Sequence, residues 1–129
     1  DAGMEKNTDN VVSCMRHPKV FFVSHPDDDH TPLDYEQLVI GAKENHVALE
    51  VNNSSLLKQE KRLNCVENYG KMLRLCMEYS VPVIVSSDAH DPFYVGRFAE
   101  SCDLLNRAGF DQELIVNTSV EKFKRFIGL

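Results

Sequence analysis

Hydrophobic residues gather in three short, almost uninterrupted runs along the chain. They cover residues 20–23, 47–51 and 81–85, and most of their members are β-branched or aromatic. A strand that is covered on both faces has such a continuous apolar pattern, which is typical of parallel sheets. We therefore predict three parallel strands. Pro82 fits the start of the third run, where no backbone donor is needed for the ladder.

Apolar residues between these runs recur at helical spacing. The spacing predicts helices over 8–15, 34–45, 63–79 and 95–107, and a last helix that follows Thr118 or Ser119 as its N-cap. A short run at 114–116 is a candidate for a fourth strand. The alternation of strands and helices predicts an α/β protein with right-handed crossovers. Three or four strands are too few to close a barrel, which takes about eight.

Composition and charge narrow the class of protein. The chain has 129 residues, enough for a single domain, and a formal net charge of -6. Its 14 Lys and Arg residues are scattered, whereas a nucleic-acid or anionic-membrane binder would carry a basic face. No apolar run approaches the roughly 18–20 residues of a membrane span. We expect a cytoplasmic protein that binds neither nucleic acid nor membrane.

The four cysteines lie far apart in the sequence, at Cys14, Cys65, Cys76 and Cys102. No pair has the CxxC spacing of a structural zinc site. Cys14, Cys76 and Cys102 fall in predicted helices among apolar neighbours. We interpret the cysteines as buried free thiols, which suits a reducing compartment.

Polar residues follow directly after each of the three predicted strands. His25 follows the first strand, Asn52 and Asn53 the second, and Asp88 and His90 the third. Because the carboxyl ends of parallel strands meet at one edge of a sheet, these side chains are expected to lie together. Aspartate and histidine two residues apart, with a further histidine from a neighbouring strand, suit Zn²⁺, Mn²⁺ or Fe. We therefore predict a metal site formed by His25, Asp88 and His90.

Each of these residues also has a structural interpretation. Asp88 can cap the following helix, and His25 can be a core histidine bonded to a carbonyl. Asn52 and Asn53 either anchor a turn or donate to a substrate oxyanion. Arg62 is the best-placed cation for a substrate phosphate, or a solvated residue at a helix start.

Other polar residues are interpreted as structural. The acidic run 27–29 is expected to be a solvated loop, with His30 as a weak additional ligand. Glu50 lies within the second strand and is expected to make a buried polar contact. His17 and His46 precede strands and therefore belong to the opposite edge. The chain has no GxSxG, P-loop or GxGxxG motif, so nothing supports a hydrolase elbow or a nucleotide cradle.

Four segments, taken in order, resemble a known family. They are Phe-Val-Ser-His-Pro at 22–26, Ala-Leu-Glu-Val-Asn-Asn-Ser-Ser at 48–55, Ser-Asp-Ala-His at 87–90 and Ile-Val-Asn-Thr-Ser at 115–119. Together they resemble the C-terminal part of the PHP (polymerase and histidinol phosphatase) superfamily. The bacterial zinc-dependent phosphatases are the branch to which they are most similar.

The resemblance implies a fold and a chemistry. The fold is the C-terminal portion of a distorted seven-stranded (β/α) barrel, here with three to four parallel strands and intervening helices. The activity is hydrolysis of small phosphate monoesters by a metal-activated water, with two or three metal ions in the complete domain. By position, His25 resembles a single histidine ligand, and Asp88 and His90 resemble the paired catalytic ligands.

The chain also departs from the family. An N-terminal His-x-His pair and a bridging Glu have no counterpart, so residues 1–129 are expected to form one partial PHP domain that is a poor catalyst alone. We expect it to associate with itself or with the missing N-terminal half, because an open sheet edge favours pairing. Two alternatives remain. One is a non-catalytic, truncated or degenerate module for binding or assembly. The other is a receiver-like domain with Asp88 as phospho-acceptor, which requires five strands and a suitably placed lysine.

Overall fold

Three parallel strands form the centre of the molecule. The computed structural model describes all 129 residues. Strands β1 (Phe22–Val23), β2 (Ala48–Asn52) and β3 (Val83–Ser86) pair in the order β1-β2-β3. Both pairings are parallel, as predicted, and the register places Leu49 opposite Val83. The α/β class is therefore confirmed, as a sheet of three strands.

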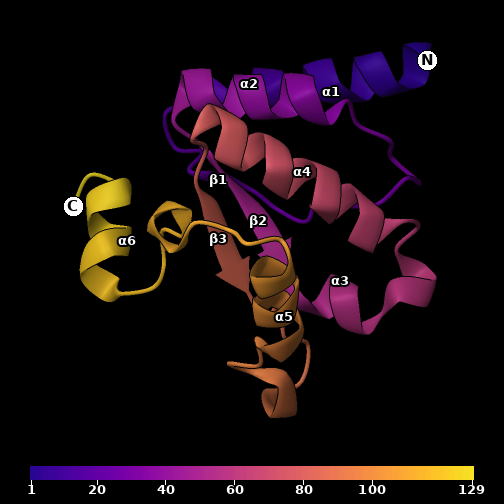
Figure 1. The fold of residues 1–129 in the computed structure, drawn as a ribbon. Coiled ribbons are helices and arrows are strands. Elements are labelled where there is room, and N and C mark those ends of the chain that lie inside the picture. The colour runs from indigo at the N-terminus through magenta and orange to yellow at the C-terminus, as the bar shows by residue number, and fades with distance from the viewer.

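Three long helices cover one face of this sheet. They are α1 (Ala2–Met15), α2 (Tyr35–Asn45) and α4 (Cys65–Tyr79), which lie together on one side of the strands in Figure 1. A single cluster of 18 buried residues joins the inner sides of these helices to Leu49, Val51 and Val83. On the other face, Ala48 and Ile84 belong to a smaller cluster, against which α6 (Val120–Phe126) packs. Alternate residues of β2 thus face different surroundings.

The expected fourth strand is reduced to a single bridge. Ile115 pairs with Val83 in parallel, and the amide of Val116 donates to the carbonyl of Val83 at 2.9 Å. Beyond it, the side chain of Asn117 takes over the ladder, because its oxygen accepts from the Val85 amide at 3.1 Å and its nitrogen donates to the Val85 carbonyl at 2.7 Å. The residues before the bridge form a 3-10 turn, η3 (Gln112–Leu114), instead of a strand.

Several boundaries differ from the sequence prediction for local reasons. Helix α5 (Ala99–Arg107) begins four residues later than expected, after Gly96 at φ +76° and a 3-10 turn, η2 (Pro92–Tyr94). The short helix α3 (Asn53–Leu57) and the turn η1 (Gln59–Lys61) follow β2 and were not predicted. The N-cap of α6 is Ser119, one of the two residues predicted for that role.

The cysteines are only partly as expected. Cys65 and Cys76 are buried, and burial raises the pKa of the Cys76 thiol to about 12. Cys14 and Cys102 are exposed, so the prediction that they are buried was wrong. Both lie on helices whose apolar side is occupied by other residues, which leaves the thiols on the outer side. All four thiols are free. No helix is both long and apolar enough to cross a bilayer.

Candidate active site

One buried carboxylate connects the carboxyl ends of all three strands. Glu50 is only 4% exposed. Its Oε2 accepts hydrogen bonds from the His25 amide at 2.6 Å, from the Ser24 hydroxyl at 3.0 Å and from Asn52 Nδ2 at 3.2 Å. Its Oε1 accepts from the hydroxyl of Ser86. The expected buried polar contact of Glu50 is confirmed, and it organises the whole edge.

The same network reaches Asp88. The amide nitrogen of Asn52 also donates to Asp88 Oδ2, at 3.0 Å. Asp88 and His25 both have positive φ angles, +44° and +30°, a region in which residues other than glycine are strained. Glu50, bonded to the backbone of His25 and linked through Asn52 to Asp88, holds both of these turns in place.

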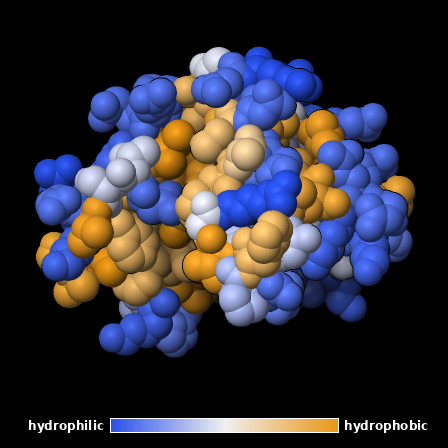
Figure 2. All heavy atoms as spheres, turned by 90° about the horizontal axis from the view of Figure 1, so that it is seen from below, coloured by the Kyte–Doolittle hydropathy of each residue, from blue (hydrophilic) through white to orange (hydrophobic).

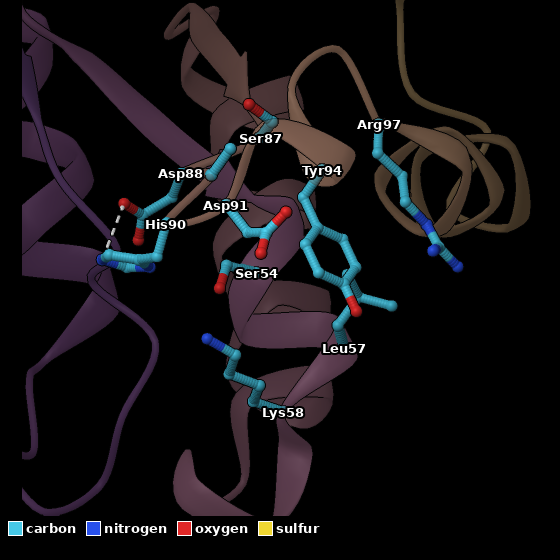
Figure 3. Close-up of a pocket in the computed structure, with 10 residues that line it drawn as sticks. Ser54, Leu57, Lys58, Ser87, Asp88, His90, Asp91, Tyr94 and Arg97 are labelled. Atoms are coloured by element: carbon cyan, nitrogen blue, oxygen red, sulfur yellow. Dashed lines mark ion pairs between the residues drawn. The ribbon is translucent and has the colours of Figure 1, made fainter.

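Asp88 and His90 lie beside one pocket at this edge. Asp88 Oδ1 is 3.9 Å from His90 Nε2, and both residues line a pocket of about 290 Å³ (Figure 3). The side chain of His90 is 71% exposed and that of Asp88 is 34% exposed, so solvent reaches both. The structure therefore brings this predicted pair together.

His25 has a different neighbour, the guanidinium of Arg62. Arg62 Nη1 lies 3.2 Å from His25 Nδ1. Because a guanidinium can only donate, a hydrogen bond between these two atoms requires Nδ1 as the acceptor. Arg62 Nη1 is also 3.9 Å from a carboxylate oxygen of Asp27 and of Asp28. His25 and Arg62 line a separate pocket of about 240 Å³, so the structure does not bring them into the pocket of Asp88 and His90.

A complete metal centre is not formed by residues of this chain. No three side chains of His, Cys, Asp or Glu lie close enough together to hold a metal ion. The donor set at Asp88 and His90, one carboxylate and one imidazole, has the right chemistry for zinc, manganese or iron.

The acidic run is not the solvated loop that we expected. Asp27 is fully buried, and neither of its carboxylate oxygens has a hydrogen-bond partner. Burial raises the pKa of Asp27, more than the nearby positive charge of Arg62 lowers it. Asp28 is partly exposed, and although desolvation opposes the shift, hydrogen bonds from His30 and Leu63 lower its pKa. The His30 ring bonds to Asp28 at 2.7 Å, and His30 does not line the pocket of Asp88 and His90.

Asn52 and Asn53 are both fully buried. Asn52 caps α3, and Asn53 joins α3 to α5 because its Nδ2 donates to Glu100 Oε2 at 2.9 Å while its Oδ1 accepts from the Ser101 amide at 2.8 Å. The hydrogen bond from Asn53 lowers the pKa of Glu100. Both asparagines anchor the loop, as one of their two interpretations stated. Their contact with a substrate stays a prediction.

The pocket contains residues that the sequence did not single out. Ser54, Lys58, Tyr94 and Arg97 line it beside Asp88. Lys58 makes no ion pair, and its ammonium group points toward the side of the pocket on which Asp88 and His90 lie (Figure 3). Lys58 follows Ser54 by one helical turn, so a prediction of α3 would have placed both on one face.

Comparison with known proteins gives consistent matches. The chain is 37% identical over 124 residues to a protein of Acetivibrio thermocellus named "Probable phosphatase", a match that covers 96% of this chain and 50% of that protein. A protein of Syntrophotalea carbinolica with the same name is 35% identical over 126 residues, which cover 98% of this chain and 52% of that protein. A probable phosphatase of a Thermoanaerobacter species is 34% identical over 96% of this chain and 50% of its own length.

The chain therefore spans about half the length of the curated relatives it matches. No family model matches it. The chain is an α/β protein with a polar pocket at the carboxyl ends of its strands. In sequence it is similar to bacterial proteins named as phosphatases.

Proposed function

We propose that this chain is part of a metal-dependent phosphatase that hydrolyses small phosphate monoesters. The observation that carries the proposal is the 37% identity to a probable phosphatase over nearly the whole chain. The resemblance of the strand-end segments to the PHP superfamily, in its zinc-dependent branch, supports the same conclusion. A PHP domain would make this sheet one part of a distorted (β/α) barrel.

In this proposal Asp88 and His90 are catalytic metal ligands, and His25 is a third ligand once its imidazole is released from Arg62. Further ligands come from outside this chain, because no three candidate groups converge within it. Zinc fits the donor set, as do manganese and iron. Two or three such ions, when bound, would supply an activated water and stabilise the charge on the phosphoryl group.

The residues of the chain hold the reacting groups. Asn52 fixes the carboxylate of Asp88, and the ammonium group of Lys58 is available to phosphate oxygens. Arg62 provides a second cation on the His25 side. In the reaction, the oxygen of water bonds to phosphorus, the bond from phosphorus to the ester oxygen breaks, and that oxygen takes a proton. The products are an alcohol and inorganic phosphate.

We also propose that the chain needs a partner for activity, either a second copy or a chain that corresponds to the unmatched half of its relatives. The edge strand β1 has no strand on its outer side, and Phe21 and Phe22, at its start, are 36% and 42% exposed. An unpaired edge with exposed aromatic residues favours pairing. Four free thiols suit the cytoplasm as the compartment.

Metal content tests the ligand assignment. The chain is co-expressed with the unmatched half of the Acetivibrio thermocellus relative, and the complex is titrated with Zn²⁺ or Mn²⁺ and analysed for metal per mole of protein, alongside the complexes of Asp88→Ala and His90→Ala. We expect bound metal in the wild type and a loss of at least tenfold in affinity in both variants. His46→Asn is the matched control, because His46 lies at the opposite edge and asparagine tolerates its positive φ. Equal metal in all four proteins would contradict the assignment.

A second candidate function is a non-catalytic module for binding or assembly. The contact of Arg62 with His25 favours it, because the guanidinium occupies Nδ1 of the imidazole and holds a positive charge 3.2 Å from it. Co-expression with the unmatched half of the Acetivibrio thermocellus relative separates the two functions. We expect a complex that releases phosphate from phenyl phosphate, and no release when Asp88→Ala is present. A stable complex without turnover would favour the module.

A further inference from the structure

The pocket beside Asp88 has two ends of different chemistry, on a face of the molecule where hydrophobic and hydrophilic residues lie side by side (Figure 2). At one end lie Asp88, His90 and the ammonium group of Lys58 (Figure 3). At the other end, Leu57 of α3 and Tyr94 of η2 provide an apolar wall. We propose that the apolar end binds the leaving group of the substrate, and that this group carries a flat, unsaturated ring that lies against Tyr94. This inference rests on the proposed function.

Tyr94 is held as a rigid platform. It belongs to the turn η2, in which Asp91 Oδ1 accepts from the Phe93 amide at 2.8 Å and the Asp91 carbonyl accepts from the Tyr94 amide at 3.0 Å. The ring of Phe93 packs edge-on against that of Tyr94, with centroids 5.4 Å apart and an interplanar angle of 84°. A fixed ring loses little entropy on binding a ligand, so its contact energy goes largely into affinity.

A cation covers part of the Tyr94 ring. The Cζ of Arg97 lies 5.6 Å from the ring centroid, and Arg97 is held there by an ion pair with Glu100 at 3.2 Å. In Figure 3, Arg97 extends on the side of Tyr94 away from Asp88 and His90. The side of the ring toward the metal-ligand pair is therefore left to a ligand.

The size and polarity of the pocket restrict what this ligand can be. A volume of about 290 Å³ is near the lower limit of small-molecule sites, so it suits a phosphate with one ring and not a polymer. The polar groups beside the Tyr94 ring are its own hydroxyl and the guanidinium of Arg97, and the guanidinium is already paired with Glu100. A polyol leaving group needs several partners there, whereas a ring needs a flat apolar contact.

Titration of the chain with three probes tests this inference by NMR. The probes are phenyl phosphate, glycerol 3-phosphate and inorganic phosphate. We expect phenyl phosphate to bind about threefold to tenfold more tightly than glycerol 3-phosphate, the size of one aromatic contact. Tyr94→Leu should remove that preference and leave the affinity for glycerol 3-phosphate unchanged. Tyr79→Leu is the matched control, because Tyr79 does not line this pocket and its hydroxyl donates to Glu36, so this variant should keep the preference.

The outcomes separate this inference from the proposed function. Lys58→Met should weaken the binding of all three probes to the same extent, because the phosphate is the only group that they share. Equal binding of phenyl phosphate and glycerol 3-phosphate, with loss of both in Lys58→Met, would overturn the ring subsite and leave the phosphate site standing. A preference that survives Tyr94→Leu would also overturn it. Absence of binding by all three probes would overturn the subsite together with the phosphate site of this chain.

Discussion

On strand β2, Leu49 and Val51 face the helices α2 and α4, whereas Glu50 faces the opposite side of the sheet. All three residues are buried. The first face is built only from apolar side chains, and it belongs to the cluster of 18 residues that contains most of the core. The second face begins with Ala48 and ends in a carboxylate with four hydrogen-bond donors.

The difference between the two faces shows that buried residues of this sheet have two different roles. On the helix-covered face, burial removes apolar surface from water and supplies stability. On the other face, burial of Glu50 is tolerated because each oxygen is bonded, and the bonds fix the turns that carry His25 and Asp88. Substitutions on the two faces should therefore have different effects on stability and on local structure.

The largest effect is expected on the helix-covered face. Leu49→Ala should lower the free energy of unfolding by about 2–5 kcal/mol, since it leaves a cavity in a fully buried position. Urea denaturation followed by circular dichroism measures it. Leu63→Ala, at a residue that is 47% exposed, is the control and should cost less than about 1 kcal/mol. Equal costs for both variants would mean that this face does not carry the core.

A smaller loss of stability, with a local signature, is expected on the other face. Glu50→Gln keeps the volume but turns an NH₂ group toward donors, so unfolding should become easier by about 1–3 kcal/mol. The amide resonances of His25 and Asp88 should shift, while those of α2 stay in place. Glu44→Gln, on the exposed side of α2, should change neither quantity. Unshifted resonances of His25 and Asp88 would disprove the organising role of Glu50.

The sequence predicted the features that depend on periodicity. The runs at 47–51 and 81–85 became parallel strands because continuous apolar residues fit burial on both faces. Helix α5 started late because Gly96 and the capped turn at Asp91 hold the preceding segment in a different conformation. The run 114–116 formed only a bridge because Asp111 caps a 3-10 turn that uses Leu114.

The candidate site was predicted less completely than the fold. The meeting of Asp88 and His90 followed from the strand ends, since position i and i+2 after one strand share an edge. The burial of Asp27 did not follow, because the direction of one side chain in an acidic run depends on contacts with Arg62 that no local pattern encodes. Lys58 was missed because five residues of helix leave too little periodicity to recognise.

The smallest change in stability is expected at Glu100, whose carboxylate accepts a hydrogen bond from Asn53. The pKa of Glu100 is lowered in the folded chain, chiefly by the hydrogen bond from Asn53 and also by Arg97. A lowered folded pKa gives stability that is present above the unfolded pKa and lost as pH falls through the folded value. Glu100→Gln should therefore cost no more than about 1 kcal/mol at pH 7 and less at pH 3.

Unfolding of both proteins at the two pH values measures this difference, with Glu44→Gln again as the control. A cost that stays the same at pH 3 would show that the carboxylate charge of Glu100 contributes nothing. The hydrogen bond from Asn53 would then contribute the same stability with an uncharged acceptor as with a carboxylate.

The carboxamide of Asn117 has a consequence for growth of the sheet. It occupies both backbone groups of Val85 on the outer side of β3, and Val116 occupies the carbonyl of Val83. The other edge, at β1, is unpaired. A particle with two open edges can add copies at both ends and form a fibre, whereas one with a single open edge is satisfied after one pairing event. Asn117 and the Val116 bridge together therefore leave β1 as the edge at which a further strand can pair.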